Sequence, residues 1–274
     1  MLVERPIKRL FTMGCSFTKY FWPSWSEIID LQLNPQEFYN FGDPGAGNSY
    51  INHTVQLNNL KYNFGPDDMI MVCWSNILRN DWFIDYEWSA EGNMLFGGKY
   101  NSLLPDKLKL PEHCLARDLV NIVGTIQLLD QIGCQHHHFS MNTMFSTDDH
   151  RTYEVFHEAV IESDYIRPLI DYCSPYLNQS FYDVLGDSVK DNWLNHFPED
   201  EFNGNEWDQH PMPVHHLTYL QSIFPDTQFN NNVLSACEKV EQRAVDILMD
   251  TPRNTEYFKT YFEQHDTLKL RDFV

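Results

Sequence analysis

The stretch GCSFT, residues 14–18, carries the first group that could do chemistry. Gly14 permits a sharp turn after an apolar run, which would place the hydroxyl of Ser16 near the start of a following helix. The N-terminal dipole of a helix favours developing negative charge, and a serine becomes nucleophilic when a base takes its proton. Ser16 is therefore a candidate nucleophile, with a polar strand end as the plainer alternative. Cys15 is a second candidate, but its place inside the turn favours a packed thiol.

Two further stretches could stabilise negative charge. In NFGDPGAGN, residues 40–48, three glycines and a proline force a tight turn that leaves backbone N–H groups uncovered. Such groups can donate to an oxyanion. In CWSN, Asn76 follows a strongly apolar run, and its side-chain amide would be another donor. Taken alone, each feature is equally typical of an ordinary turn.

The fourth stretch, WDQHPMPVHH at residues 207–216, offers a base. Asp208 lies two residues before His210, and a carboxylate this close can hold an imidazole as a base toward a serine. A loop histidine beside an aspartate is also common as a purely structural pair. His215 and His216 begin a following helix and stay open as alternative bases.

A metal site is the rival interpretation of QHHHF, residues 135–139. Alternation along a strand puts only His136 and His138 on one face. No spaced acidic or thiolate partner is evident in the sequence. We therefore expect no metal and no other cofactor.

The elements that must position these stretches can be read from the first 140 residues, where strand-like and helix-like segments alternate. Strands are expected at residues 8–14, 37–42, 67–75 and 134–141, and helices at residues 23–33, 47–63 and 111–132. This alternation predicts a parallel α/β sheet with helices on both sides. In such a sheet the loops after the strands form the ligand crevice, so the first three stretches would meet at one edge.

Two helices have the clearest apolar faces. The first ends at Gly133, and its face comprises Leu115, Leu119, Ile122, Ile126 and Leu129. The second lies in a C-terminal helical extension from about residue 225, and its face comprises Val233, Cys237, Val240, Ala244 and Ile247. Segments near 77–110 and 146–205 have weaker periodicity and are interpreted as aromatic-rich loops or insertions. We therefore expect one domain over residues 1–274 with two insertions.

Composition narrows the class of ligand. The 19 Lys and Arg against 39 Asp and Glu give a formal charge of −20, which disfavours nucleic acid and anionic membrane surfaces as partners. Aromatic residues make up 15% of the chain, more than a core usually needs, so some are expected to line a cleft or a partner surface. No apolar run approaches the ~18 residues that span a bilayer.

The cysteines and the N-terminus bear on location. Six cysteines are scattered without CxxC spacing, and MLVERPIKRL lacks an apolar signal-peptide core. The cysteines are expected to be reduced core thiols in a cytoplasmic protein, although association with a virion is compatible with the same features. The oligomeric state stays open.

The order Ser, Gly, Asn and then Asp-His resembles the SGNH (GDSL-like) hydrolase family over residues 1–140 and 205–222. The resemblance implies a flavodoxin-like three-layer α/β/α sandwich with a parallel sheet of about five strands. It also implies hydrolysis or transfer of acyl esters without a cofactor. The family's nucleophile falls on Ser16, its backbone oxyanion donors on Ser16 and Gly45, and its side-chain donor on Asn76. Its acid and base look like Asp208 and His210.

The chain departs from the family's motifs at three points. Cys15 stands where the family has aspartate, Trp74 stands where it has glycine, and the Asp-His spacing is two instead of the commoner three. The resemblance implies a serine esterase that removes acyl or acetyl groups from a small molecule or carbohydrate. An acyltransferase using the same residues, and a non-catalytic carbohydrate-binding or virion structural module on the same scaffold, are the alternatives.

Overall fold

The computed structural model describes residues 1–93, 110–144, 158–186, 188, 210–250 and 268–274. The chain forms two compact units. The first, which we call the sheet unit, comprises Val3–Thr18 and Pro35–Asp183. The second, the helical unit, comprises Met1–Leu2, Lys19–Asn34 and Val184–Val274. Each unit is described by itself.

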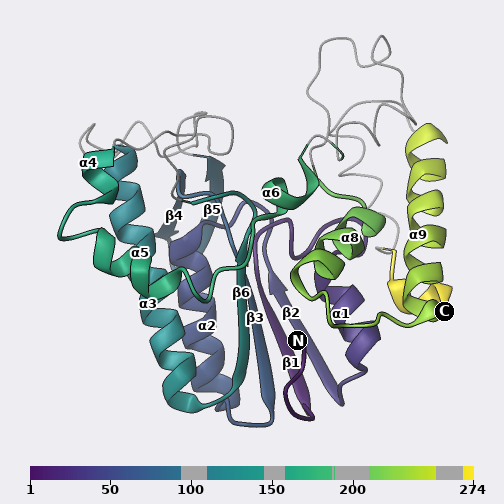
Figure 1. Cartoon of the computed structure of the whole chain (residues 1–274). Helices are drawn as coiled ribbons and strands as arrows, with labels where there is room; N and C mark the ends of the chain where they lie inside the picture. The colour runs from purple at the N-terminus through teal and green to yellow at the C-terminus, as the bar shows by residue number, and fades with distance from the viewer. Residues whose placement is uncertain (94–109, 145–157, 187, 189–209, 251–267) are drawn as a thin grey trace. The chain divides into compact units, whose positions relative to one another are not determined.

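The sheet unit is built on four parallel strands (Figure 1). They are β1 (Arg9–Gly14), β2 (Glu37–Gly42), β3 (Asp68–Trp74) and β6 (Gln135–Ser140), in the order β2-β1-β3-β6. This is the flavodoxin-like order, so the predicted α/β class is confirmed. The sheet has four strands where about five were expected. Beside β6, the described chain adds only a parallel bridge between His138 and Leu177.

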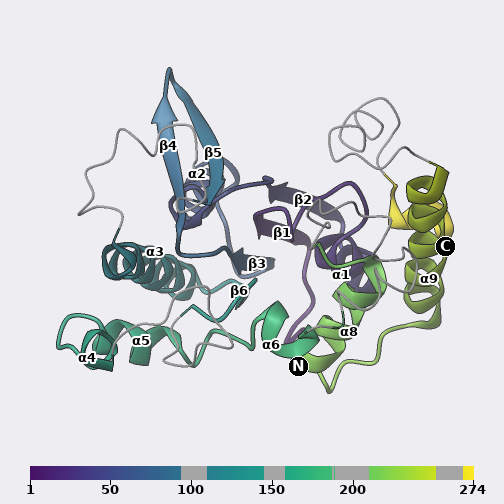
Figure 2. The same cartoon turned by 90° about the horizontal axis from the view of Figure 1, so that it is seen from above.

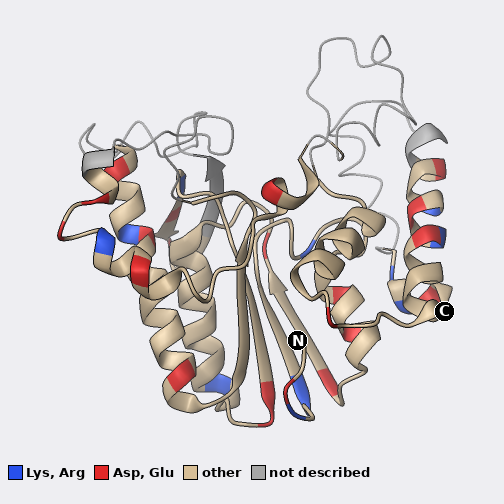
Figure 3. Ribbon diagram, viewed as in Figure 1, with Lys and Arg blue, Asp and Glu red and all other residues tan. Residues whose placement is uncertain are grey.

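The burial of the strands follows from their sequences. All seven residues of β3 are buried, as expected for a central parallel strand with both faces covered. The charged residues of the strands stand at their amino ends, in Arg9 of β1, Glu37 of β2 and Asp68 of β3, as Figure 3 shows at the lower edge of the sheet. The carboxyl ends are therefore the uncharged ends, and they carry the candidate stretches.

Two long helices, α2 (Asn48–Tyr62) and α3 (Pro111–Ile132), lie along the same face of the sheet (Figures 1 and 2). The predicted apolar face of α3 is buried, and Gly133 ends the helix with a φ of 73°. Three short helices follow later in the chain: α4 (Glu158–Ile161), α5 (Arg167–Cys173) and α6 (Phe181–Leu185), the last of which spans the boundary between the two units. They lie in the segment that the sequence analysis interprets as a loop or insertion.

The first expected insertion also contains regular structure. β4 (Arg79–Ile84) and β5 (Glu87–Asn93) pair as an antiparallel hairpin. Its two-residue turn consists of Asp85 and Tyr86, which both have positive φ, the conformation that favours a tight hairpin turn. The hairpin lies in the segment that is interpreted from the sequence as a loop or insertion, and its two strands were not predicted.

The helical unit contains α1 (Trp25–Leu33), α8 (Pro213–Ile223), α9 (Asn231–Asp250) and the short 3₁₀ helix η5 (Leu270–Phe273). Within this unit α8 packs against α1 and α9. The guanidinium of Arg271 donates to both carboxylate oxygens of Asp30, each at 2.9 Å, and so ties η5 to α1. The predicted apolar face of α9 is buried.

All six cysteines are buried, and none forms a disulfide. Within the ranges that the structure describes, no helix is long and apolar enough to cross a membrane.

Candidate active site

The turn that follows β1 presents Ser16. A Cβ atom on Gly14 would overlap Thr18 Oγ1 and lie 2.9 Å from the Cys73 carbonyl oxygen, so this position requires glycine. The Thr18 N–H donates to the Cys15 carbonyl at 2.9 Å and closes the turn around Ser16. The side chain of Ser16 is 4% exposed. The predicted turn is therefore present and holds Ser16 at the carboxyl end of β1.

Gly45 lies in the loop after β2 with a φ of 85°, the left-handed conformation that the glycine-rich stretch indicates. The Ala46 N–H donates to the Asp43 carbonyl at 3.0 Å, which closes the turn. The Asp43 N–H donates to the Gly14 carbonyl at 3.0 Å and links this loop to the end of β1. Gly45 and Ser16 therefore follow two adjacent strands at the same edge of the sheet.

Asn76 follows β3 at that edge and forms a tight turn. Its Oδ1 accepts a hydrogen bond from the Leu78 N–H at 2.8 Å, and its carbonyl accepts from the Arg79 N–H at 3.1 Å. Because Oδ1 accepts this hydrogen bond, the orientation of the Asn76 side-chain amide is fixed, and Nδ2 is the atom that can donate to another group. Within the described part of the chain, Nδ2 forms no hydrogen bond.

The β4–β5 hairpin holds the start of α2. Both carboxylate oxygens of Asp81 accept backbone hydrogen bonds, from the Gly47 N–H at 2.7 Å and from the Tyr50 N–H at 2.8 Å. Burial raises the pKa of Asp81, and these N–H groups oppose that shift. Arg79 donates to the Ala46 carbonyl at 3.2 Å. The loop that contains Gly45 is thus fixed by residues some thirty-five positions away in the sequence.

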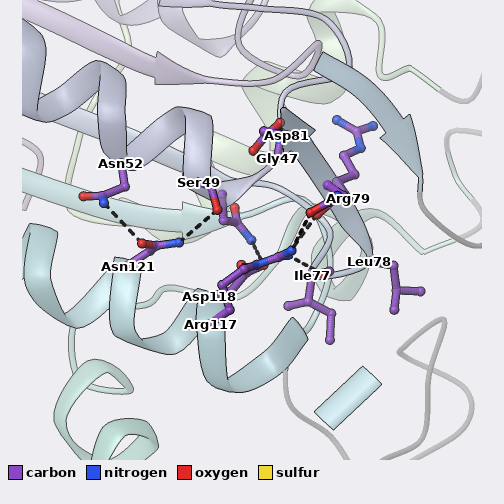
Figure 4. Close-up of polar contacts among 12 residues, drawn as sticks. Gly47, Ser49, Asn52, Ile77, Leu78, Arg79, Asp81, Arg117, Asp118 and Asn121 are labelled. Atoms are coloured by element: carbon purple, nitrogen blue, oxygen red, sulfur yellow. Dashed lines mark hydrogen bonds and ion pairs between the residues drawn. The ribbon is translucent and has the colours of Figure 1, made fainter. Parts of the chain in front are cut away.

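Asn48, the first residue of α2, is bound to the end of β3. Its Oδ1 accepts from the Ser75 N–H at 2.7 Å, and its Nδ2 donates to the Ser75 carbonyl at 3.1 Å. The same Nδ2 donates to Asp118 Oδ2 at 2.7 Å. Asp118 is fully buried beside Arg117, and burial raises its pKa to about 6 despite this pairing. Figure 4 shows Arg117 and Asp118 of α3 beside the loop after β3.

The candidate base His210 belongs to the helical unit. Its ring stacks on Tyr20 with ring centroids 3.8 Å apart and an interplanar angle of 15°. The next residue, Pro211, accepts a hydrogen bond from Trp22 Nε1 at 2.8 Å on its carbonyl oxygen. The loop before α8 is therefore anchored to the segment that precedes α1, and His210 is half-buried there. Asp208 lies outside the described residues.

The two alternative histidines have structural contacts within the same unit. His215 Nδ1 accepts the Met212 N–H at 3.3 Å and so caps the start of α8. His216 is 1% exposed, and burial lowers its pKa well below 6.5, which keeps it neutral. Both histidines therefore have structural roles at the start of α8.

The histidines of β6 form a chain of hydrogen bonds. Trp74 Nε1 can only donate, so His138 Nδ1 accepts this bond at 3.2 Å. His138 Nε2 then donates to His136 Nδ1 at 3.0 Å, and His136 Nε2 donates to Asp130 at 3.0 Å. Asp130 is an acidic partner that the sequence analysis does not find. In the described ranges no three His, Cys, Asp or Glu side chains are grouped to hold a metal ion.

This chain also accounts for Trp74, one of the departures from the family's motifs. The Trp74 side chain is fully buried and stacks on the His138 ring at a centroid distance of 6.1 Å. Cys15, another departure, is fully buried, and its sulfur lies 4.0 Å from Met141 Sδ. Both residues therefore have packing roles at the edge of the sheet where Ser16 lies.

The structure brings Ser16, Gly45 and Asn76 to one edge of the sheet unit. It places His210 in the helical unit, next to Tyr20. The residues that the sequence analysis misses are those that hold the loops: Asn48, Asp81, Arg117, Asp118 and Tyr20. One signal was available, because Asp118 falls within the apolar face of α3, three residues after Leu115 and four before Ile122.

Solved structures with a similar arrangement include several hydrolases. A member of the lipolytic protein G-D-S-L family from Veillonella parvula is 16% identical, with 80% of this chain and 100% of that chain covered and a TM-score of 0.42. A variant of an acetyl xylan esterase from Geobacillus stearothermophilus is 10% identical, with 82% and 96% covered and a TM-score of 0.43. An α/β hydrolase from the metagenome of Lake Arreo is 13% identical, with 86% and 97% covered and a TM-score of 0.39.

No family model matches the sequence, and no curated protein matches it either.

Proposed function

We propose that this protein is a serine esterase of SGNH type, with Ser16 as the nucleophile. The observation that supports the proposal most directly is a set of hydrogen-bond donors at one edge of the sheet that have no acceptor among the described residues. Within the described part of the chain, neither the Ser16 N–H nor the Gly45 N–H donates a hydrogen bond, and Asn76 Nδ2 does not either. Hydrogen-bond donors left open at the edge of the sheet that carries Ser16 suit an oxyanion.

The proposed reaction has two steps. His210, oriented by Asp208, takes the proton of Ser16 as its oxygen attacks the ester carbonyl, and the three donors stabilise the tetrahedral oxyanion. The alcohol leaves with that proton, and the acyl group stays on Ser16. Water then attacks the acyl-enzyme with His210 as base and releases the acid. No step needs a cofactor.

The proposed substrate is an acyl ester, in particular an acetyl ester, of a small molecule or carbohydrate. Aromatic residues are abundant in the chain, and flat side chains stack on sugar rings. The net charge of −20 disfavours polyanionic partners and suits a neutral or cationic ester.

The test is hydrolysis of a short-chain aryl ester by the purified full chain, together with covalent labelling by a fluorophosphonate. We expect the parent to hydrolyse the ester and to be labelled at Ser16, and Ser16→Ala to do neither while keeping the parent's melting temperature. Labelling of Ser16 without release of acid in water, but with release to an added alcohol, would identify an acyltransferase. A parent protein that neither hydrolyses nor labels would refute the proposal in favour of the non-catalytic module.

A further inference from the structure

Two consecutive residues of α3, Arg117 and Asp118, hold the chain after and before Asn76. Arg117 contacts the chain after it: Nη2 donates to the carbonyl oxygens of Ile77 at 3.1 Å and of Arg79 at 2.9 Å. Nη1 of the same guanidinium donates to Asn80 Oδ1 at 3.0 Å. Figure 4 shows the Arg117 side chain directed at these carbonyls. One side chain thereby binds three acceptors within the four residues that follow Asn76.

Asp118 acts on the chain before Asn76, through Asn48. Asp118 Oδ2 accepts one hydrogen of Asn48 Nδ2, and the other hydrogen goes to the Ser75 carbonyl. With one N–H committed to each acceptor, the Asn48 amide has a single orientation, and its Oδ1 holds the Ser75 N–H. Both backbone polar groups of Ser75 are therefore fixed by an amide whose rotation is blocked by Asp118.

We infer that Arg117 and Asp118 are the positioning residues for the side-chain amide of Asn76. Hydrogen bonds that begin at this one turn of α3 fix the chain just before and just after Asn76. The inference rests on the proposed function, in which Asn76 Nδ2 donates to the oxyanion. An oxyanion donor must be held within a few tenths of an ångström, because misplacement of a reacting group by about 1 Å can cost 10²-fold in rate.

The packing of α2 against α3 does not itself require this charged pair. One turn further along, the same helices are joined by neutral hydrogen bonds, from Asn52 Nδ2 to Asn121 Oδ1 at 3.2 Å and from Asn121 Nδ2 to Ser49 Oγ at 3.3 Å. A buried carboxylate is expensive unless it is paired, and neutral or apolar residues often replace such pairs without loss of stability. The charged pair occurs where the two helices reach the loop that carries Asn76.

Protonation of Asp118 would weaken the contacts that hold Asn48. Oδ1 accepts from Arg117 Nε at 2.7 Å and Oδ2 accepts from Asn48, and both bonds lose strength when the carboxylate loses its charge. The other titratable groups that bear on Asp118 are Asp81 on β4 and the Cys114 thiol on α3. The resonance of the Ser75 amide therefore offers a direct readout, because its acceptor Asn48 is held by Asp118.

The experiment compares two variants with a matched pair at the opposite end of the sheet. Asp118→Asn replaces one acceptor oxygen by an amide that faces a donor, and Arg117→Lys keeps the charge but loses the planar fork. The controls are Asp68→Asn and Arg9→Lys, because the guanidinium of Arg9 donates to both oxygens of Asp68 at 2.7 and 2.6 Å at the amino ends of β1 and β3.

We expect Asp118→Asn to lower kcat for the aryl ester by about 10²-fold with little change in KM, which is the signature of a displaced transition-state donor. Arg117→Lys should lower kcat in the same direction. The control variants should lower the melting temperature but keep kcat within about twofold of the parent. Unchanged kcat in the α3 variants, or an equal fall in both sets, would overturn the inference.

A nuclear magnetic resonance measurement on the parent tests the same inference without relying on activity or on a variant that folds. The Ser75 backbone amide and the Asn76 side-chain amide should shift together with a midpoint near the pKa of Asp118, about 6. The Asp68→Asn control should show the same titration. Resonances of Ser75 and Asn76 that do not move between pH 5 and pH 7 would refute the positioning role. A parent that titrates in this way but hydrolyses no ester would refute the proposed function alone.

Discussion

The most discriminating change is at Asn76, because its side chain has one atom with a structural contact and one with a proposed catalytic contact. Oδ1 accepts the Leu78 N–H at 2.8 Å, whereas Nδ2 is proposed to donate to the oxyanion. Asn76→Ala removes both atoms, and Asn76→Asp removes only the donor. The two variants therefore separate the turn from the chemistry.

The structural loss can be worked out from the contact. Asn76 is 7% exposed, so its removal leaves a buried Leu78 N–H without its acceptor, which costs about 1 to 3 kcal/mol of unfolding free energy. Loss of a single oxyanion donor typically lowers kcat by about 10²- to 10³-fold. Asn76→Ala should show both effects, with KM little changed because the contact is made mainly in the transition state.

Asn76→Asp keeps an oxygen for the Leu78 N–H and places a negative charge where the oxyanion would form. We expect it to lose at least as much kcat as the alanine variant, and to lose unfolding free energy at neutral pH because the new carboxylate is buried. Urea denaturation and active-site-titrated kcat on the same preparation give both quantities. Asn58→Ala is the matched control, because Asn58 is buried in α2 and donates to the Thr54 carbonyl at 2.8 Å, away from the carboxyl edge. An Asn76→Asp variant with parental kcat would refute the oxyanion role.

Three further predictions concern the turn, the base and the buried carboxylate. Gly14→Ala should destabilise the fold by about 1 to 3 kcal/mol, measured by urea denaturation, because the new methyl group overlaps the Thr18 hydroxyl. His210→Ala should remove most of kcat with little change in KM, whereas His216→Ala should lower the melting temperature and keep most of kcat. Folding raises the pKa of Asp118 from 3.8 to about 6, so this group contributes stability that is fully present below pH 3.8 and is lost as pH rises through about 6. The unfolding free energy of the parent relative to Asp118→Asn should therefore fall between pH 5 and pH 7, and a constant difference would contradict the assignment.

The strands and long helices could be predicted because their signals are local. β2 was predicted at its observed bounds, and α3 was predicted from the 4-3-4-3 spacing of its apolar residues and the glycine that ends it. The flavodoxin-like order was expected from the resemblance to the SGNH hydrolases, since parallel strands joined by helices also form other orders. The loops after such strands meet at one edge, so the positions of Ser16 and Asn76 in the fold also followed from the sequence.

The β4–β5 hairpin could not be predicted in the same way. Its turn residues, Asp85 and Tyr86, lack the glycine that usually marks two positive-φ positions, and tyrosine rarely adopts this conformation. The hairpin is nevertheless the element that caps α2 through Asp81. The hairpin and Asp81 were therefore missed for the same reason. The turn residues have only a weak local preference for a hairpin, and the contact of Asp81 with the start of α2 is a tertiary contact that local patterns do not contain.

The contacts that hold Asn76 show most clearly what local patterns leave out. Nothing within ten residues of Asn76 indicates that its neighbours are bound by Asn48 on one side and by Arg117 on the other. The sequence contains one indication of these contacts, because Asp118 is an acidic residue on an otherwise apolar helix face. Its pKa of about 6 against 3.8 in the unfolded chain corresponds to about 3 kcal/mol of unfolding free energy lost when it is ionised near neutral pH. The neighbouring contacts between α2 and α3 are neutral and avoid this loss of unfolding free energy. A buried carboxylate is therefore expected at this position if the geometry around Asn76 matters more than stability.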